Sequence, residues 1–161
     1  MMPPKAILFD AGFTLVDPRV PVNETYLEKA RRAGATIEAE DFHPAFMKHW
    51  RRVVVDYRSA NPELLSSEEM ERAAWVDFTR DLAKQFPTLS DRFDEWHRGL
   101  VEHFDGPEAW RLVPGAEELL ASLAARSIRV AVVSNWHSSL DGILEGLGIR
   151  RHFEFVLTSA E

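Results

Sequence analysis

The chain has 161 residues, a formal net charge of −7 and a pI near 5.4. Hydrophobic residues make up 45% and charged residues 28%, the balance of a globular protein with one core or a core plus a modest insertion. The acidic balance argues against nucleic acid as the main partner, and the absence of cysteine excludes disulfides and cysteine-ligated metals. No run approaches the roughly 18 apolar residues of a membrane span. The first strand comes too early for a signal peptide, so we expect a cytoplasmic protein with no membrane partner.

The first predicted element is a short buried strand at Ala6–Phe9, where four apolar residues stand in a row. Asp10 follows directly, and Gly12 and Thr14 come close behind it. In open α/β sheets ligands bind just outside the carboxyl ends of the strands, which is where this pattern places Asp10. An aspartate there can act as a nucleophile and form a covalent intermediate that water later cleaves. The simpler interpretation is an aspartate that caps a turn after a strand.

Helical periodicity replaces the strand pattern between residues 18 and 104. We expect helices at residues 22–33, 40–58, 66–86 and 90–104, the first ended by Gly34 and the third opened by a Ser66–Glu69 capping box. Their apolar stripes predict a small bundle that forms a lid over one edge of the sheet, and core packing is the main role expected for the aromatic residues. The residues expected to face inwards are Tyr26, Leu27, Ala30, Phe42, Phe46, Trp50, Val54, Met70, Ala74, Phe78, Leu82, Phe93, Trp96, Leu100 and Phe104.

Strands and helices alternate in the last third of the chain. A helix at Pro114–Ala125, with Ala116, Leu119, Leu120 and Leu123 inwards, precedes a buried strand at Ile128–Val133. A helix at 138–147, stopped by Gly148, and a strand at 153–157 follow. This order predicts a parallel sheet with right-handed crossovers. The Ser134 hydroxyl and Asn135 amide, at the end of the second strand, could therefore hold a phosphoryl group or another anion over Asp10.

We expect structural or surface roles for the other polar residues that could be mistaken for site residues. Asp17 stands before Pro18, and we expect it in a turn rather than in a catalytic role. His137 is expected in a solvent-facing loop or at a helix N-terminus, although a contact with substrate is the alternative. His97 and His103 are expected on the surface, because their spacing suits no metal site.

The motifs together resemble the haloacid dehalogenase superfamily. The resemblance lies in Asp10–Leu15, in Val132–Asn135 much later, and almost continuously from Val113 to Glu161. It implies an incomplete Rossmann-like α/β core at residues 1–17 and 105–161, with an inserted helical cap at 18–104. It further implies that Asp10 is the nucleophile and that Thr14, Ser134 and Asn135 position the group under attack. Magnesium would be bound by the Asp10 carboxylate and the Gly12 backbone carbonyl.

Two departures from the family pattern keep several functions open. Phosphatases of this family usually carry a second aspartate where this chain has Gly12, and their third and fourth motifs would fall after Glu161. A phosphatase-like hydrolase acting on a small phosphorylated metabolite is the leading hypothesis. The first alternative is a 2-haloacid dehalogenase, whose halide leaves without a proton, although such enzymes commonly have a tyrosine at the Gly12 position. The second alternative is a binding or assembly module without turnover.

Without the third and fourth motifs, we expect the 161-residue chain by itself to behave differently from a complete enzyme of this family. We expect it to show little or no turnover and to bind magnesium weakly or not at all. In the family's sheet the Asp10 strand lies in the middle, with two strands beside it that come from later sequence. Without them Ala6–Phe9 would be an edge strand beside an uncovered apolar face, and we expect self-association there.

Overall fold

The computed structural model describes residues 4–52 and 67–160, so that Val54 and Ser66 lie outside the described residues. The chain forms two compact units, one of residues 1–19 and 104–161 and the other of residues 20–103. These bounds differ from the predicted core and cap by one or two residues. We call them the core unit and the helical unit.

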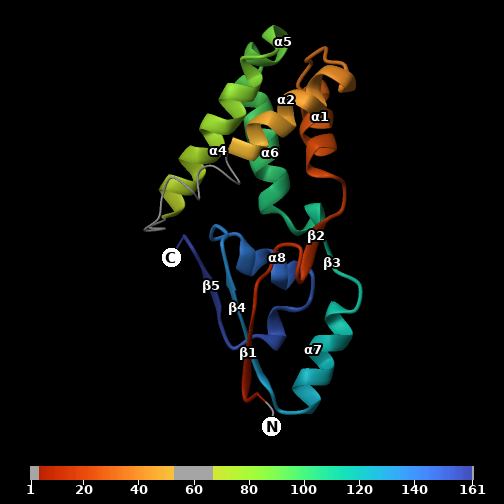
Figure 1. Ribbon diagram of the computed structural model, residues 1–161, viewed down its shortest axis with the longest axis vertical. Coiled ribbons are helices and arrows are strands. Elements are labelled where there is room, and N and C mark those ends of the chain that lie inside the picture. The colour runs from red at the N-terminus through yellow and green to blue at the C-terminus, as the bar shows by residue number, and fades with distance from the viewer. Residues whose placement is uncertain (1–3, 53–66, 161) are drawn as a thin grey trace. The chain divides into compact units, whose positions relative to one another are not determined.

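The core unit is built on a parallel three-stranded sheet. Its strands are β1 (Ala6–Phe9), β4 (Arg129–Ser134) and β5 (Val156–Thr158), side by side in the order β1-β4-β5 (Figure 1). Phe9 is paired with Val132, and Ser134 with Thr158. Because the strands are parallel, the residues that follow all three meet at one edge of the sheet. The α/β fold with a parallel sheet is as predicted.

Both long helices of the core unit pack on the same face of this sheet. These are α7 (Ala116–Ala125) and α8 (Leu140–Gly146). Right-handed crossovers that step twice in the same direction, from β1 to β4 and on to β5, place their helices on one side. The buried core on that side comprises Ala11, Leu15, Val16, Ala116, Leu120, Leu123, Val130, Val132, Leu140, Leu144, Ile149 and Phe153.

The other face of the sheet is apolar and exposed. Leu8, Val133 and Leu157 lie on it, because Leu8 is paired with Ala131 and Val133 with Leu157, and alternate residues of a strand share a face. Their exposed fractions are 62%, 41% and 45%. An apolar surface of this kind is a site where another chain segment can bind.

A small antiparallel ribbon lies where the chain leaves and re-enters the core unit. It was not predicted from the sequence. It consists of β2 (Val16–Pro18) and β3 (Trp110–Leu112), which follows a short 3-10 helix, η2 (Pro107–Ala109). The prediction that Asp17 lies in a turn is wrong, because Asp17 lies in β2 opposite Arg111. A backbone hydrogen bond of 2.8 Å from Arg19 to Ala109 extends the pairing.

The helical unit is packed around aromatic side chains. Its helices are α1 (Val22–Arg32), α2 (Ala39–Arg51), α4 (Glu68–Ala83), α5 (Pro87–Ser90) and most of α6 (Phe93–Asp105). Tyr26 makes edge contacts with Phe46, Phe78 and Trp96 at centroid distances of 5.1, 5.8 and 5.9 Å. Trp96 Nε1 also donates a 3.0 Å hydrogen bond to the Tyr26 carbonyl. These aromatic residues form the core of the unit, as expected.

Several local predictions in the helices are wrong. Ser67, rather than Ser66, caps α4, and its Oγ accepts a 3.3 Å hydrogen bond from the amide of Met70. Met70 therefore lies in an exposed first turn. Leu119 is exposed because the buried stripe of α7 runs through Ala116, Leu120 and Leu123. Among the described helices none combines the length and apolar character needed to cross a bilayer.

Candidate active site

Asp10 lies at the carboxyl end of β1, with its carboxylate held by two donors. Ser134 Oγ donates a 2.6 Å hydrogen bond to Asp10 Oδ1, and the amide of Ala11 donates one of 2.8 Å to the same oxygen. The parallel pairing of β1 with β4 places Asp10 and Ser134 side by side, as the sequence predicted. The second carboxylate oxygen accepts no hydrogen bond from the described residues, and Asp10 is exposed. A carboxylate arranged in this way has one oriented oxygen and one accessible oxygen.

The loop after Asp10 is a tight turn with local strain. The carbonyl of Ala11 accepts hydrogen bonds from the amides of Thr14, Leu15 and Val16 at 3.2, 2.8 and 3.0 Å. Phe13 adopts a left-handed backbone with φ of 57°, which is uncommon for an aromatic residue, and its side chain is 75% exposed. Strained residues of this kind concentrate at functional sites.

Within the described part of the chain, the Thr14 hydroxyl makes no hydrogen bond to the Asp10 carboxylate. Its side chain is exposed. The positioning role that the resemblance gives to Thr14 therefore requires a bound group for the hydroxyl to contact.

The carboxyl ends of β4 and β5 meet beside Asp10. Ser134 is buried, whereas Asn135 is exposed and its Oδ1 accepts a 2.6 Å hydrogen bond from Ser159 Oγ. The amide of Ser159 also donates to the carbonyl of Ser134 at 3.1 Å. Ser159 is not among the site residues predicted from the sequence. The same strand-end rule that located Asp10 and Ser134 would have found it, because it directly follows β5.

The side chain of Trp136 packs beside the loop that follows Asp10. A Cβ atom added to Gly12 would lie 3.3 Å from Cζ3 of Trp136. Trp136 in turn packs edge-to-face on Trp110, with ring centroids 4.7 Å apart. Its Nε1 is buried and has no hydrogen-bond partner in the part of the chain that the structure describes. Trp136 is not among the predicted site residues either, although it directly follows Ser134 and Asn135.

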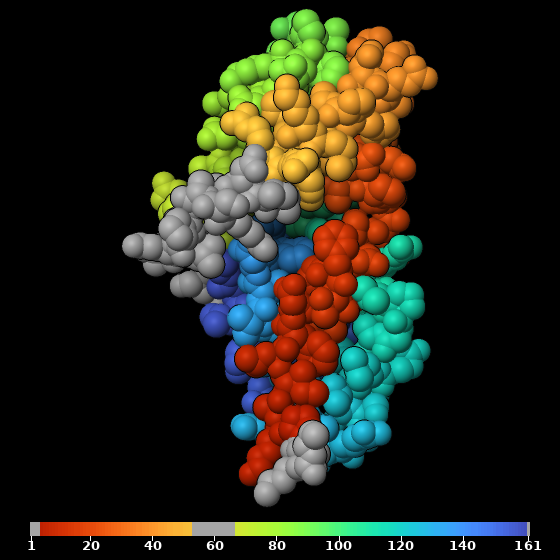
Figure 2. Space-filling model, viewed as in Figure 1, coloured from red at the N-terminus to blue at the C-terminus, as the bar shows by residue number. Residues whose placement is uncertain are grey.

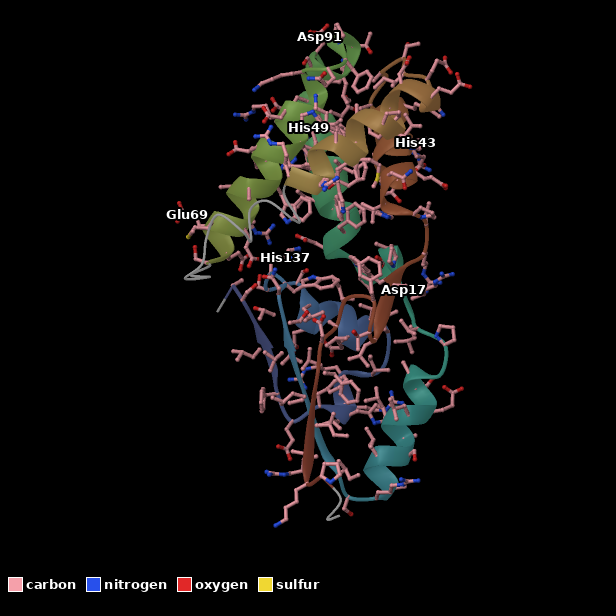
Figure 3. All side chains as sticks on the ribbon, viewed as in Figure 1. Asp17, His43, His49, Glu69, Asp91 and His137 are labelled. Carbon is pink, nitrogen blue, oxygen red and sulfur yellow. The ribbon has the colours of Figure 1, made fainter. Side chains whose placement is uncertain are left out.

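His137 lies just past the end of β4, before α8 (Figure 3). Its Nδ1 is 2.8 Å from Ser139 Oγ, and its Nε2 is 3.6 Å from Asp105 Oδ1. Only 18% of its side chain is exposed, so it does not face solvent as one part of the expectation had it. The other part, a place at a helix N-terminus, agrees with its position before α8, where its carbonyl accepts a 3.2 Å hydrogen bond from the amide of Leu140. A hydroxyl and a carboxylate fix the orientation of its ring.

The oxygen donors near Asp10 are of the kind that magnesium prefers. Mg²⁺ commonly binds one or two carboxylates and fills its remaining positions with water and phosphate oxygens. The Asp10 carboxylate and the Gly12 carbonyl would supply two such oxygens. Across residues 4–52 and 67–160, no group of three or more His, Cys, Asp or Glu side chains could hold a metal.

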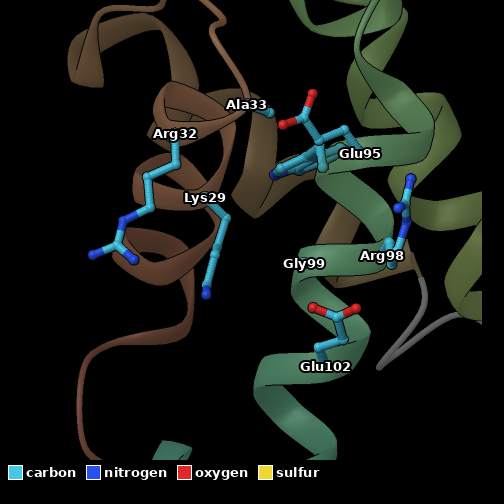
Figure 4. A pocket seen from close by; sticks show the side chains of 8 residues that line it. Lys29, Arg32, Ala33, Glu95, Arg98, Gly99 and Glu102 are labelled. Atoms are coloured by element: carbon cyan, nitrogen blue, oxygen red, sulfur yellow. The ribbon is translucent and has the colours of Figure 1, made fainter.

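An open depression lies in the helical unit, between α1 and α6 (Figure 4). Lys29, Arg32, Glu95, Arg98 and Glu102 line it, so its surface carries both signs of charge. None of its lining residues comes from the sheet edge that carries Asp10. It is therefore separate from the residues with candidate chemistry.

Comparison with known proteins identifies the family. A model of the haloacid dehalogenase-like hydrolases, within the class of hydrolases, matches residues 4–161. The chain belongs to this family. It is 32% identical over 163 aligned residues to the mouse haloacid dehalogenase-like hydrolase domain-containing protein 3, covering 96% of the chain and 61% of the relative. This haloacid dehalogenase-like hydrolase thus spans about three fifths of the length of the curated relatives that it matches.

Several solved structures show the same fold. A dehalogenase superimposes with a TM-score of 0.60 at 22% identity, over 97% of this chain and 62% of that one. A predicted phosphoglycolate phosphatase from Haemophilus somnus superimposes with a TM-score of 0.56 at 16% identity, over 97% of this chain and 63% of that one. Phosphatases and dehalogenases are thus both among the structural neighbours of this haloacid dehalogenase-like hydrolase, and identities this low indicate the fold alone.

Proposed function

We propose that Asp10 is the nucleophile of a hydrolase that acts on a small phosphorylated metabolite. The observation that carries this proposal is the 2.6 Å hydrogen bond from Ser134 to Asp10 Oδ1 at the open edge of the sheet. A nucleophilic carboxylate must be oriented and must keep one oxygen accessible to substrate. Asp10 meets both conditions, and the haloacid dehalogenase-like family is one of hydrolases.

The reaction would proceed in two steps. One oxygen of Asp10 attacks phosphorus, and the leaving group departs with the electron pair of the bond that breaks. Water then attacks the aspartyl phosphate, releases inorganic phosphate and restores the carboxylate. Thr14 and Asn135 would hold the phosphoryl oxygens, and Ser134 would join them by turning its single hydroxyl hydrogen from Asp10 Oδ1 to the substrate. Mg²⁺, held by the Asp10 carboxylate and the Gly12 carbonyl, would offset the negative charge of the phosphoryl group when bound.

A dehalogenase is the second candidate, favoured by Gly12. A glycine supplies no proton to a leaving group, and a halide needs none. In that reaction Asp10 would attack carbon to form an ester, and water would then cleave the ester. The two candidates share the nucleophile and differ in the atom attacked.

The test is hydrolysis by the longest natural form of the protein that contains these residues. We expect turnover of an aryl phosphate with magnesium, and a loss of several orders of magnitude in Asp10→Asn, because a covalent nucleophile is removed. Asp17→Asn is the matched control, since Asp17 lies in the ribbon rather than at the sheet edge. Activity of Asp10→Asn near that of the wild type would refute the assignment.

The same assay separates the alternatives. Turnover of 2-chloropropionate but not of aryl phosphate would select the dehalogenase. Binding of inorganic phosphate without turnover of either compound would select the binding module. We expect the 161-residue chain by itself to show little or no turnover.

A further inference from the structure

We propose that Trp136 determines which leaving groups the site accepts. Its indole lies close enough to Gly12 to crowd a side chain at this position, so that no acid side chain supplies a proton there. The substrates would then be those whose leaving group departs as a stable anion, such as an aryl oxide, the carboxylate of an acyl phosphate, or a halide. This inference rests on the proposed nucleophilic role of Asp10.

Packing against Trp136, rather than backbone geometry, explains the glycine at position 12. Gly34, Gly115 and Gly148 are the glycines with positive φ among the described residues, and Gly12 is not one of them. A Cβ at position 12 would lie 3.3 Å from Cζ3 and 4.0 Å from Cε3 of Trp136. The first distance is closer than side-chain carbons normally approach.

Trp136 has little freedom to move away. It packs against the buried core of the core unit and lies edge-to-face on Trp110. Trp110 is itself fixed, because its Nε1 donates a 3.0 Å hydrogen bond to the carbonyl of Phe104. Trp136 is partly buried, and these contacts oppose displacement of its ring.

The surface that Trp136 presents to Gly12 cannot take part in proton transfer. The two atoms in contact, Cζ3 and Cε3, are carbons of the six-membered ring. In the first step the bond from phosphorus to the leaving group breaks, both electrons go to the leaving group, and no proton is added. The bond from Asp10 to phosphorus forms at the same time, so charge and atoms balance. The rate should therefore depend steeply on the acidity of the leaving group.

The kinetic test compares an alkyl phosphate with a series of aryl phosphates of graded leaving-group acidity, in the longest natural form of the protein. We expect kcat/KM of the wild type to fall steeply as the leaving group becomes more basic. Gly12→Asp alone should lower the absolute rates, since Gly12 borders the nucleophile, but the dependence on leaving-group acidity should stay as steep as in the wild type, because the indole blocks a productive carboxylate. Gly12→Asp combined with Trp136→Ala should raise the ratio of alkyl to aryl turnover by about 10-fold or more, as a positioned general acid does. Trp136→Ala with Gly142→Asp, a position with open space around it, controls for the added charge.

A second measurement does not depend on turnover. Gly12→Ala should lower the melting temperature of the wild type and have no such effect in Trp136→Ala. An equal loss in both backgrounds would overturn the inference, as would turnover in the wild type that is insensitive to the leaving group. If no substrate is turned over, the hydrolase proposal and the leaving-group role fail together, and the melting temperatures still decide whether Trp136 excludes a side chain at position 12.

Discussion

The Ser134 hydroxyl donates a 2.6 Å hydrogen bond to Asp10 Oδ1, although 124 positions separate the two residues. The register of β1 and β4 produces this contact, since Phe9 is paired with Val132 and β4 runs on for two residues to Ser134, within reach of Asp10. Hydrogen bonds from hydroxyls to carboxylates are short and strong because the acceptor is charged. Ser134 therefore fixes the orientation of the Asp10 carboxylate.

We expect Ser134→Ala to lower kcat/KM by about 10- to 100-fold, because a hydrogen bond to a charged group contributes about 1.5–3 kcal/mol. Steady-state kinetics on an aryl phosphate would measure the loss. Ser138→Ala, in an exposed position of the following loop, should keep the activity of the wild type. Full activity in Ser134→Ala would show that this hydrogen bond does not orient the nucleophile.

Two glycines of α8 should respond in opposite ways to alanine. A Cβ on Gly146 would lie 2.5 and 2.6 Å from Cβ and Cγ of Pro107, whereas nothing lies within 4 Å of one on Gly142. We expect Gly146→Ala to lower the free energy of unfolding by about 1–3 kcal/mol through overpacking. Gly142→Ala should raise it by up to about 1 kcal/mol, since alanine favours helix. Chemical denaturation would measure both changes, and equal effects would contradict the close contact with Pro107.

The helical unit should lose stability in mild acid. Burial lowers the pKa of His49, with Arg52 and Lys48 adding to the shift and Asp81 opposing it. Burial also lowers the pKa of His97, with Arg80 adding and Asp94 opposing. His97, expected on the surface, is half-buried and its Nδ1 lies 3.0 Å from Thr79 Oγ1.

The sign of this pH dependence of stability follows from proton uptake by the two histidines. Unfolded histidines take up protons near pH 6.5, whereas these two resist protonation in the folded state. Protons therefore favour the unfolded state, and the free energy of unfolding falls as the pH drops below about 6.5. Urea denaturation across a pH series would measure this dependence. The free energy of unfolding should fall less in His49→Gln and in His97→Gln than in the wild type. Variants that decline as steeply as the wild type would contradict this assignment.

The 161-residue chain should self-associate through β1 and the apolar face beside it. Among the described strands β1 is paired only with β4, and its residues run along the surface of the core unit, in red in Figure 2. Light scattering over a concentration series should show growth in mass. Leu8→Lys should reduce it, because a charge on an edge strand opposes pairing. Leu119→Lys, an exposed leucine on α7, should not. A chain that stays monomeric at every concentration would refute the prediction.

The sequence predicted those parts of the fold and site that depend on local patterns. Ala6–Phe9 is an uninterrupted apolar run, and polar residues at strand ends follow a general rule of open sheets, so Asp10 and Ser134 were found together. Strands β2 and β3 were missed because three residues show no usable alternation and their partners lie far apart in the chain.

The contacts that the sequence could not reveal arise from packing. The approach of Trp136 to Gly12 depends on how the chain after β4 turns back over the loop of Asp10, which no pattern of residue types encodes. Ser67 caps α4 without a capping box, since Met70 and not a glutamate stands three residues after it, so the Ser66–Glu69 pattern pointed to the neighbouring serine. The burial of His137 likewise depends on Ser139 and on Asp105, which lies on a different element.

Because of the β2–β3 ribbon, the helical unit could be removed from the chain while the two strands stay paired. The two crossing segments run antiparallel, and Arg19 and Ala109 are held together by a backbone hydrogen bond. The segment between them is one long hairpin loop that contains the helical unit and residues 104–108 of the core unit, and the entropy of closing such a loop rises only slowly with its length. Antiparallel strands can also be joined by a two-residue turn. A miniature protein with an Asn-Gly turn in place of residues 20–108 should therefore keep the pairing of Val16 with Leu112, and such permissive sites are where evolution can exchange one insert for another.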